Sequence, residues 1–283
     1  MLQHRQLFGV IGDPVSHSLS PTMHEFFMRT FHLNGCYHAC RVRAHELRDA
    51  IRGAQALGFV GLNVTVPHKT ATLELIDEID EVAEQIGAVN TLHFTGGRIK
   101  GYNTDAPGFL QSLQHEHISL KDRHVFILGA GGAARAVAFA ARQAGAARLQ
   151  IFNRTPARAE KLALEVHGEP AAMEEIMMLP EQSVIVNATT VGMMPDTERS
   201  PLPEELFFAN LIYVDLVYNP VQTRFLYFAR KAGARAIDGL GMLIFQGIRA
   251  LEIWTGRVLD ISPWYAELKT GLEKQLNTLY QWI

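Results

Sequence analysis

HVFILGAGGAA, residues 124–134, carries the clearest structural signal in the chain. Its first part, His124–Leu128, is an apolar run of strand length, and the glycine-rich turn Gly129–Ala134 follows at once. The alanine-rich stretch Ala133–Ala144 that comes next is typical of a helix. In the pattern G-x-G-x-x-A, the glycines permit a tight turn and a close approach to a pyrophosphate, and the helix N-terminus offers free N–H groups. We therefore predict a dinucleotide site, the alternative being a strand–turn–helix that binds nothing.

The end of the next strand distinguishes NADP from NAD. Enzymes that use NAD place an acidic residue there, which binds the ribose 2′-hydroxyl. Here the strand Arg148–Phe152 ends in the sequence NRTPAR, which has no acid but carries Arg154 and Arg158. A guanidinium group suits the geometry of a phosphate, so this segment favours NADP. The alternative is that Thr155 and the following proline cap the next helix and both arginines are solvated, although a cap and a phosphate site can coexist.

The segments that follow continue the same pattern. Short apolar runs at Ser183–Asn187, Leu211–Leu216 and Arg235–Ile237 are separated by stretches of helical character. Alternation of this kind predicts a parallel, doubly wound sheet. It identifies the middle of the chain as an α/β domain of its own.

The N-terminal part also has an α/β pattern. Strands are expected at Leu7–Ile11 and Phe59–Val66, and a helix at Pro21–Leu33 with Ser20 as its N-cap. Val89–Phe94 and Arg98–Tyr102 indicate a hairpin around two glycines.

The end of the chain is helical, with segments at Gly241–Trp254 and Pro263–Tyr280. Two helices cannot bury enough surface to make a domain, so we expect them to pack on the N-terminal part. The predicted organisation is a discontinuous domain, residues 1–104 and 239–283, around an inserted domain, residues 105–238.

Composition excludes several classes of protein. The 283 residues suit two domains, and the 48% apolar and 19% charged fractions are those of a globular protein. A net charge of −3 argues against a nucleic-acid-binding surface, and no apolar run is long enough to cross a membrane. The N-terminus has no signal-peptide pattern. Two cysteines and scattered histidines predict a cytoplasmic protein without a metal site, and a monomer and a homodimer both remain open.

Four polar clusters follow or precede predicted strands in the N-terminal part: HSLSP (17–21), NVTVPHK (63–69), GAVNT (87–91) and GYNTD (101–105). Taken one at a time, each has a structural explanation. Ser20 and Asp105 are candidate helix caps, and Lys69 is a candidate exposed lysine on a first helical turn. Spacing alone does not indicate that the four clusters converge.

The chain resembles the shikimate dehydrogenase family, and the resemblance changes this interpretation. It rests on those four clusters and on five further matches in the family's order: GAGGAAR (129–135), NRTPAR (153–158), NATTVGM (187–193), DLVYNP (215–220) and DGLGMLIFQG (238–247). Thr190 stands where the family usually has serine, a mild change that leaves the role of Thr189 intact. The fold implied is an α/β substrate domain completed by the C-terminal helices, with a Rossmann-type NADP-binding domain inserted.

The resemblance also implies roles for individual residues. Lys69 and Asp105 would be the catalytic pair, with the division of labour between them left open. The substrate would be bound by Ser18, Ser20, Thr65, Asn90, Tyr218 and Gln246. NADP would be bound by Gly129, Ala130, Gly131, Gly132, Ala133, Asn153, Arg154, Thr155, Arg158, Thr189, Leu216 and Gly239.

The implied reaction is the reversible reduction of 3-dehydroshikimate to shikimate by NADPH, a step toward aromatic amino acids. Two alternatives stay open at this stage. One is a relative in the same family that acts on quinate or uses NAD. The other is a binding protein without catalysis, which the presence of both Lys69 and Asp105 argues against.

Overall fold

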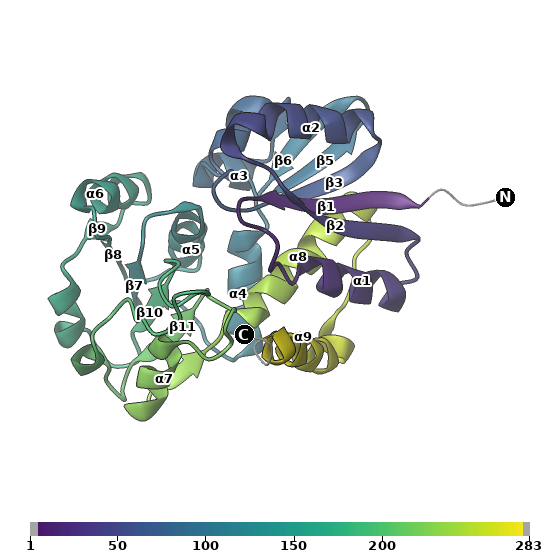
Figure 1. Cartoon of the computed structure of the whole chain (residues 1–283). Coiled ribbons are helices and arrows are strands. Elements are labelled where there is room, and N and C mark those ends of the chain that lie inside the picture. The colour runs from purple at the N-terminus through teal and green to yellow at the C-terminus, as the bar shows by residue number, and fades with distance from the viewer. Residues whose placement is uncertain (1–4, 280–283) are drawn as a thin grey trace. The chain divides into compact units, whose positions relative to one another are not determined.

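Two six-stranded sheets organise the chain, one in each of two units (Figure 1). The computed structural model describes residues 5–279. Unit 1 contains the described residues up to Gly108 together with Leu243–Lys274. Unit 2 contains Phe109–Met242 and the last turn of the final helix.

The sheet of unit 1 is mixed and has the order β2-β1-β3-β5-β6-β4. Strands β1, β2 and β3 are parallel, whereas β3, β5 and β6 pair antiparallel. The predicted hairpin of β5 and β6 is confirmed, and its turn residues Gly96 and Gly97 have φ of 58° and 77°, as a tight two-residue turn requires. The strands are β1 (Gln6–Gly12), β2 (Gly35–Arg41), β3 (Phe59–Val64), β4 (Glu78–Ile79), β5 (Thr91–Thr95) and β6 (Arg98–Tyr102).

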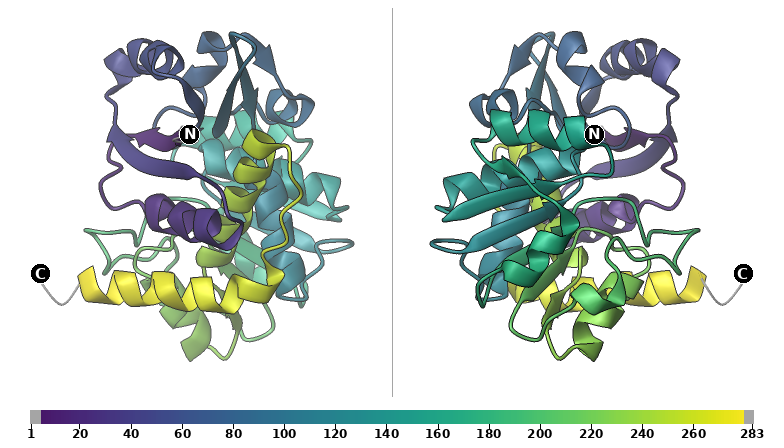
Figure 2. Two further views of the ribbon diagram at one scale, coloured as in Figure 1. Left: turned by 90° about the vertical axis from the view of Figure 1, so that its right-hand side faces the viewer. Right: turned by 90° about the vertical axis from the view of Figure 1, so that its left-hand side faces the viewer.

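Helices cover both faces of this sheet, because its strands alternate apolar side chains between the two sides. On one face, α2 packs on a core that includes Ile11, Leu62 and Leu92. On the other lie α1, along the β1–β2 edge, and α8 (Figures 1 and 2). The helices of this part are α1 (Ser20–Thr30), α2 (Leu47–Ala56), α3 (Glu81–Ile86), α8 (Leu240–Thr255) and α9 (Tyr265–Leu279), with short 3-10 turns η1 (Ala44–Glu46), η2 (Ala71–Leu75) and η5 (Ser262–Trp264).

Helix α8 completes this domain through Trp254. A Cβ atom on Gly61 of β3 would lie 1.9 Å from Nε1 of Trp254, so only glycine leaves room for the indole. The indole N–H donates to the carbonyl oxygen of Leu92 on β5, at 2.8 Å. The C-terminal helices are therefore part of the fold of the first domain, as the sequence predicts.

His24 of α1 is enclosed in an aromatic cluster on the same face. Its ring stacks on Tyr37 with 4.1 Å between centroids and also contacts Phe27 and Trp254. Neither ring nitrogen has a hydrogen-bond partner, and the amide of Asn63 beside it is already bonded to Tyr37 and Thr91. Burial lowers the pKa of His24 from 6.5 to about 3, so the native ring is neutral.

Acid should therefore weaken unit 1 through His24. The unfolded histidine takes up a proton below about pH 6.5 while the native one does not, so stability is lost as pH falls through this range. The loss should reach roughly 2 kcal/mol between about pH 6.5 and pH 5. Thermal unfolding of His24→Phe should show a flatter acid limb than the wild type, and parallel curves for the two proteins would contradict this account.

The sheet of unit 2 is fully parallel, as predicted, with the order β9-β8-β7-β10-β11-β12. This is the strand order of a dinucleotide-binding sheet, in which β7 and β10 flank the point where the order reverses. The strands are β7 (His124–Leu128), β8 (Arg148–Phe152), β9 (Glu169–Pro170), β10 (Val184–Asn187), β11 (Ile212–Asp215) and β12 (Arg235–Ile237). The helices are α4 (Asp105–His115), which leads from unit 1 into unit 2, α5 (Gly132–Gln143), α6 (Pro156–Glu165) and α7 (Arg224–Lys231), with 3-10 turns η3 (Met173–Met178) and η4 (Glu204–Leu206).

Some local predictions were wrong. Helix α1 begins at Ser20 itself, and its first backbone N–H is bonded to the hydroxyl of Ser18 at 3.2 Å, so Ser20 is not the cap. Lys69 lies in the turn before η2 and not on a helical turn. The last residue of the predicted final helix, Tyr280, lies outside the described residues.

Candidate active site

Lys69 and Asp105 form an ion pair inside unit 1. The distance from Lys69 Nζ to Asp105 Oδ2 is 2.5 Å, and the two side chains are 14% and 7% exposed. The lysine follows β3 and the aspartate opens α4, so the fold joins residues 36 positions apart. A partly desolvated ion pair of this kind is typical of proton transfer, and it argues against an exposed lysine.

Asp105 is free to make this pair because another residue caps α4. Oδ1 of Asn103 accepts from the backbone N–H groups of Asp105 and Ala106, at 3.0 and 3.3 Å. The expectation that Asp105 caps the helix was therefore wrong. Its carboxylate points instead to Lys69 and to Asn90, whose Nδ2 donates to Oδ1 at 2.8 Å.

Both ends of the Asn90 amide take part in this network. Its Nδ2 donates to Thr104 Oγ1 as well as to Asp105, and its Oδ1 accepts from the Thr104 backbone N–H at 2.7 Å and from Thr91 Oγ1 at 3.0 Å. All of these side chains are buried. Asn90 therefore fixes the orientation of the Asp105 carboxylate in addition to any contact with substrate.

Ser18, Ser20 and Thr65 lie at the end of β1 and β3. The two strands are parallel neighbours, so the segments after them leave the sheet at the same edge. The Thr65 backbone N–H donates to the Ile11 carbonyl at 2.9 Å, and a Cβ on Gly12 would lie 2.4 Å from Thr65 Cγ2. Thr65 thus sits directly beside the start of the loop that carries the two serines.

Gln246 and Tyr218 come from other elements of the chain. Gln246 lies on α8, with its backbone against Gly108 of α4, and its side-chain amide donates to Leu243 of its own helix. No hydrogen bond among the described residues connects it to Lys69 or Asp105. Tyr218 belongs to unit 2, in the loop after β11.

The start of α5 in unit 2 is built to receive an anion. Gly131 is its N-cap and no side chain caps the helix, so backbone N–H groups of the first turn are free. A Cβ on Gly131 would meet no atom within 4 Å, which leaves open space above this end of the helix. Gly129 has φ of +114° and makes the tight turn after β7. The predicted residues Gly129 to Ala133 therefore fit a pyrophosphate.

The segment after β8 carries two unpaired cations. Arg154 and Arg158 are exposed, and the guanidinium group of neither forms an ion pair or a hydrogen bond with another described residue. Arg135 on α5, by contrast, is paired with Glu165 at 2.5 Å. Thr155 is the N-cap of α6 but makes no side-chain capping bond, while Asn153 donates to its carbonyl at 2.9 Å.

The remaining predicted cofactor residues lie at the same edge of this sheet. A Cβ on Gly129 would contact Cγ2 of Thr189 at 3.1 Å, so the first glycine and the loop after β10 are in contact. A Cβ on Gly239 would lie 2.6 Å from the carbonyl oxygen of Leu216, which places these two backbones together. The carboxyl edge of a doubly wound sheet is where such folds bind dinucleotides.

Comparisons with known proteins agree with this arrangement. The model of the shikimate dehydrogenase substrate-binding domain matches residues 10–92, that of shikimate / quinate 5-dehydrogenase matches residues 111–200, and that of the shikimate 5′-dehydrogenase C-terminal domain matches residues 239–269. A shikimate dehydrogenase (NADP(+)) of Methanopyrus kandleri is 46% identical over 88% of this chain and 89% of its own. The chain belongs to the shikimate dehydrogenase family.

Solved structures of the family share the whole fold. The shikimate 5-dehydrogenase of Thermus thermophilus, in complex with NADP(H) and shikimate, has 42% identity and a TM-score of 0.86, covering 96% of this chain and 99% of that one. A shikimate dehydrogenase in complex with NADP+ has 38% identity and a TM-score of 0.88, covering 95% and 96%. The chain is thus an NADP-dependent oxidoreductase of this family, with a Rossmann-type domain beside its substrate domain.

Several residues that surround the Lys69–Asp105 ion pair have no role assigned from the sequence. Asn103, Thr91 and Thr104 hold Asn90 and Asp105 by hydrogen bonds, and His68 anchors the Lys69 turn through Nε2 to the Val42 carbonyl at 2.7 Å. In the sequence, the clustering of Asn and Thr in GAVNT and GYNTD, next to buried strands, is the signal that could have identified Asn103, Thr91 and Thr104. Buried polar side chains need partners, and here they are partners of one another.

Two features are absent from the part of the chain that the structure describes. Among residues 5–279, no three His, Cys, Asp or Glu side chains are grouped so as to hold a metal ion. Within the same residues, none of the helices has the length and apolarity to cross a membrane.

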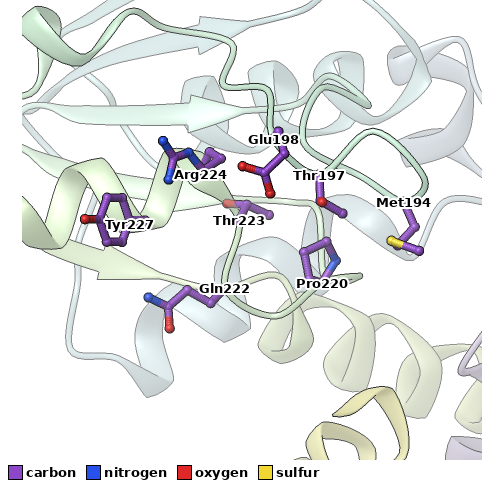
Figure 3. Close-up of a pocket in the computed structure, with 8 residues that line it drawn as sticks. All are labelled: Met194, Thr197, Glu198, Pro220, Gln222, Thr223, Arg224 and Tyr227. Carbon is purple, nitrogen blue, oxygen red and sulfur yellow. The ribbon is translucent and has the colours of Figure 1, made fainter. Parts of the chain in front are cut away.

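A hollow of about 370 Å³ lies in unit 2, and its lining includes Pro220 of the DLVYNP motif. Figure 3 shows it between the loop that carries Thr197 and Glu198 and the start of α7 at Thr223 and Arg224. None of its lining side chains is a predicted site residue. The hydroxyl of Thr223, which lines the hollow, donates to the buried carboxyl group of Asp215.

Proposed function

We propose that this chain catalyses the reversible NADP-dependent reduction of 3-dehydroshikimate to shikimate, with Lys69 and Asp105 as its proton-transfer pair. The observation that carries the proposal is the ion pair of 2.5 Å, nearly buried in a domain that belongs to the shikimate dehydrogenase substrate-binding family. NADPH supplies the hydride when it is bound.

Lys69 is the group that gives the proton. Reduction of a ketone leaves an alkoxide oxygen, and that oxygen must gain one proton. Both oxygens of Asp105 are occupied, Oδ2 by Lys69 and Oδ1 by Asn90, whereas the ammonium has three N–H bonds and uses one of them on Asp105. The lysine therefore protonates the oxygen, and Asp105 holds Nζ in place and balances its charge. In the oxidation of shikimate the neutral amine takes the hydroxyl proton.

Ser18, Ser20, Thr65 and Tyr218 are proposed to bind the substrate carboxylate. Three of them are hydroxyl groups at the carboxyl edge of the unit 1 sheet, and hydroxyls donate well to a carboxylate. Asn90 and Gln246 are proposed to contact the ring hydroxyls. Supporting evidence is the match of all six residues to family motifs.

The residues for NADP are proposed in three groups. The free N–H groups from Gly129 to Ala133 bind the pyrophosphate. Asn153, Arg154, Thr155 and Arg158 bind the adenine ribose and its 2′-phosphate. Thr189, Leu216 and Gly239 bind the nicotinamide half. The domain assignment that goes with this proposal is residues 105–238 for NADP and residues 1–104 and 239–283 for the substrate.

A steady-state matrix tests the whole proposal. Shikimate and quinate are each supplied with NADP+ and with NAD+, and NADPH or NADH formation is followed. The proposal expects the highest kcat/KM for shikimate with NADP+. A preference for quinate would move the chain to the quinate-oxidising branch of the family, and absence of turnover with all four combinations would overturn the enzymatic assignment.

Arg154→Ala should impair the use of NADP+ selectively. A charge-assisted hydrogen bond to the 2′-phosphate is worth roughly 1.5–3 kcal/mol, or about ten- to a hundredfold in binding. The Kd of NADP+ should rise by this factor, while the weaker affinity for NAD+, which lacks that phosphate, stays nearly unchanged. Arg142→Ala, on the exposed last turn of α5, is the matched control. An equal loss for both cofactors would refute a 2′-phosphate role.

We also propose a cytoplasmic enzyme that is a monomer or a homodimer. The two cysteines, Cys36 and Cys40, are free thiols, which suits a reducing compartment. Size-exclusion chromatography with light scattering distinguishes the two oligomeric states.

A further inference from the structure

Asp215 is a buried acid at the end of β11 that joins three segments of unit 2. Its side chain is fully enclosed and accepts three hydrogen bonds. Oδ2 accepts from Thr223 Oγ1 at 2.6 Å, and Oδ1 accepts from Asn187 Nδ2 and from the Val217 backbone N–H, both at 2.9 Å. The three donors come from the end of β10, the loop after β11 and the N-cap of α7.

Asp215 also fixes the orientation of the Asn187 side-chain amide. All three partners of Asp215 donate to it, so Asn187 presents its NH₂ group to the acid and its carbonyl oxygen to the other side. That oxygen accepts from both the backbone N–H and the hydroxyl of Thr189, at 3.1 and 2.7 Å. Because the Thr189 hydroxyl proton is used here, its oxygen faces the Val191 N–H, which donates to it at 3.1 Å.

We infer that Asn187 is a positioning residue for the cofactor: it transmits the orientation set by Asp215 to Thr189 and so holds the loop after β10 in the shape that receives NADP. The inference rests on the proposed function, in which Thr189 and Leu216 line the nicotinamide half of the site. The Leu216 N–H donates to the backbone carbonyl of Asn187 at 3.0 Å, so the loop after β11 also begins beside this residue.

The energetics support a functional role for the acid in this network. Burial raises the pKa of Asp215 from 3.8 to about 7, and Asp238 adds to the rise, while the three hydrogen bonds oppose it. The native state therefore keeps a proton that the unfolded state has already lost between about pH 4 and pH 7, and stability falls as pH rises through that range. A buried acid that lowers the stability of the fold at neutral pH is consistent with a functional role for that acid.

Asn187→Asp tests the inference directly. The change keeps the size of the side chain but replaces the donor by a second carboxyl group. At about pH 6 the two acids can share one proton, which restores a donor between them. At about pH 9 both carboxyl groups are ionised, and they repel each other. The Kd of NADP+, measured by calorimetry, should therefore exceed that of the wild type by about tenfold or more at the higher pH, and by much less at the lower pH.

The double variant Asn187→Asp/Asp215→Asn should recover most of this affinity at the higher pH. It restores one donor and one acceptor with the positions exchanged, at the loss of the acceptor for Val217. The Kd of shikimate should change much less than that of NADP+ in each variant, since five of the six proposed substrate residues lie in unit 1. Gln222→Ala, an exposed neighbour of Thr223 outside the network (Figure 3), is the control and should bind NADP+ normally.

Further variants separate the two ways in which the idea can fail. Thr189→Ala probes the proposed cofactor contact itself, and an unchanged Kd of NADP+ there would overturn that part of the proposed function. If Thr189→Ala binds NADP+ more weakly while Asn187→Asp binds it normally at the higher pH, the positioning role alone is overturned. If Asn187→Asp does not fold, Asn187→Ser replaces it, since a serine hydroxyl is too short to bond both Asp215 and Thr189; normal NADP+ binding by that variant would equally refute the inference.

Discussion

Replacing Lys69 by alanine should lower kcat by about a hundredfold or more, the contribution typical of a positioned acid–base group. The variant loses the ammonium that protonates the alkoxide, and no other cation is bonded to Asp105 among the described residues. The Kd of NADP+ should change little, because the cofactor residues lie in unit 2. Steady-state kinetics in both directions, together with calorimetry for NADP+, provide the measurement.

The partner and the control follow from the same geometry. Asp105→Asn keeps the bond to Asn90 possible but removes the charge next to Lys69, so kcat should fall to a similar extent. The double variant should be little worse than the worse single variant, because residues that act as a unit are not additive. Lys100→Ala removes a lysine of the same unit, on β6, whose ammonium lies over the ring of Tyr102 and not at the pair, and should keep normal turnover.

One result would remove Lys69 from the mechanism. If Lys69→Ala kept near-normal kcat and only raised the KM of shikimate, the lysine would be a binding residue. The pair would then be a structural ion pair, and the source of the proton would have to be sought elsewhere.

The parts of the fold that the sequence predicts well are those that depend on local rules. His124–Leu128 and Arg148–Phe152 are strands with those bounds, because short apolar runs beside glycine turns have few alternatives. The glycines of the first βα turn are placed for the same reason. The absence of an acid after β8 can be read from one short segment, and the structure adds that both arginines there are unpaired.

Long-range hydrogen bonds set the limit of such prediction. A local rule makes Asp105 a helix cap, but the structure gives the cap to Asn103, because Lys69 and Asn90 compete for the carboxylate of Asp105. Ser18 likewise takes the role expected of Ser20, because its hydroxyl accepts from the first N–H of α1. The bond between Asn187 and Asp215 spans 28 positions, and no periodicity relates the two residues. Partner choice among buried polar groups is decided only after the sheet has formed.

Trp254→Ala should be the most destabilising of the changes considered, at roughly 3–5 kcal/mol, the usual cost of truncating a buried aromatic side chain. The indole is 4% exposed and packs against Phe8 and the backbone of Gly61. Its removal leaves a cavity, since glycine has no side chain that could fill the space, and it leaves the Leu92 carbonyl without its donor. Unfolding by urea, followed by circular dichroism, should show a much lower midpoint for unit 1.

The same substitution should also reduce activity before the protein unfolds. Gly61 and Asn63 are on the face of β3 that α8 covers, and from Asn63 hydrogen bonds run through Thr91 and Asn90 to Asp105. Loss of packing beneath β3 loosens Asn63, the first residue in this series of hydrogen bonds, so kcat should fall together with stability. Trp264→Ala is the matched control, because that indole is 37% exposed and meets only the ring of Phe31 among the aromatic contacts of the described residues. A Trp254→Ala protein as stable as Trp264→Ala would contradict the view that the C-terminal helices complete the substrate domain.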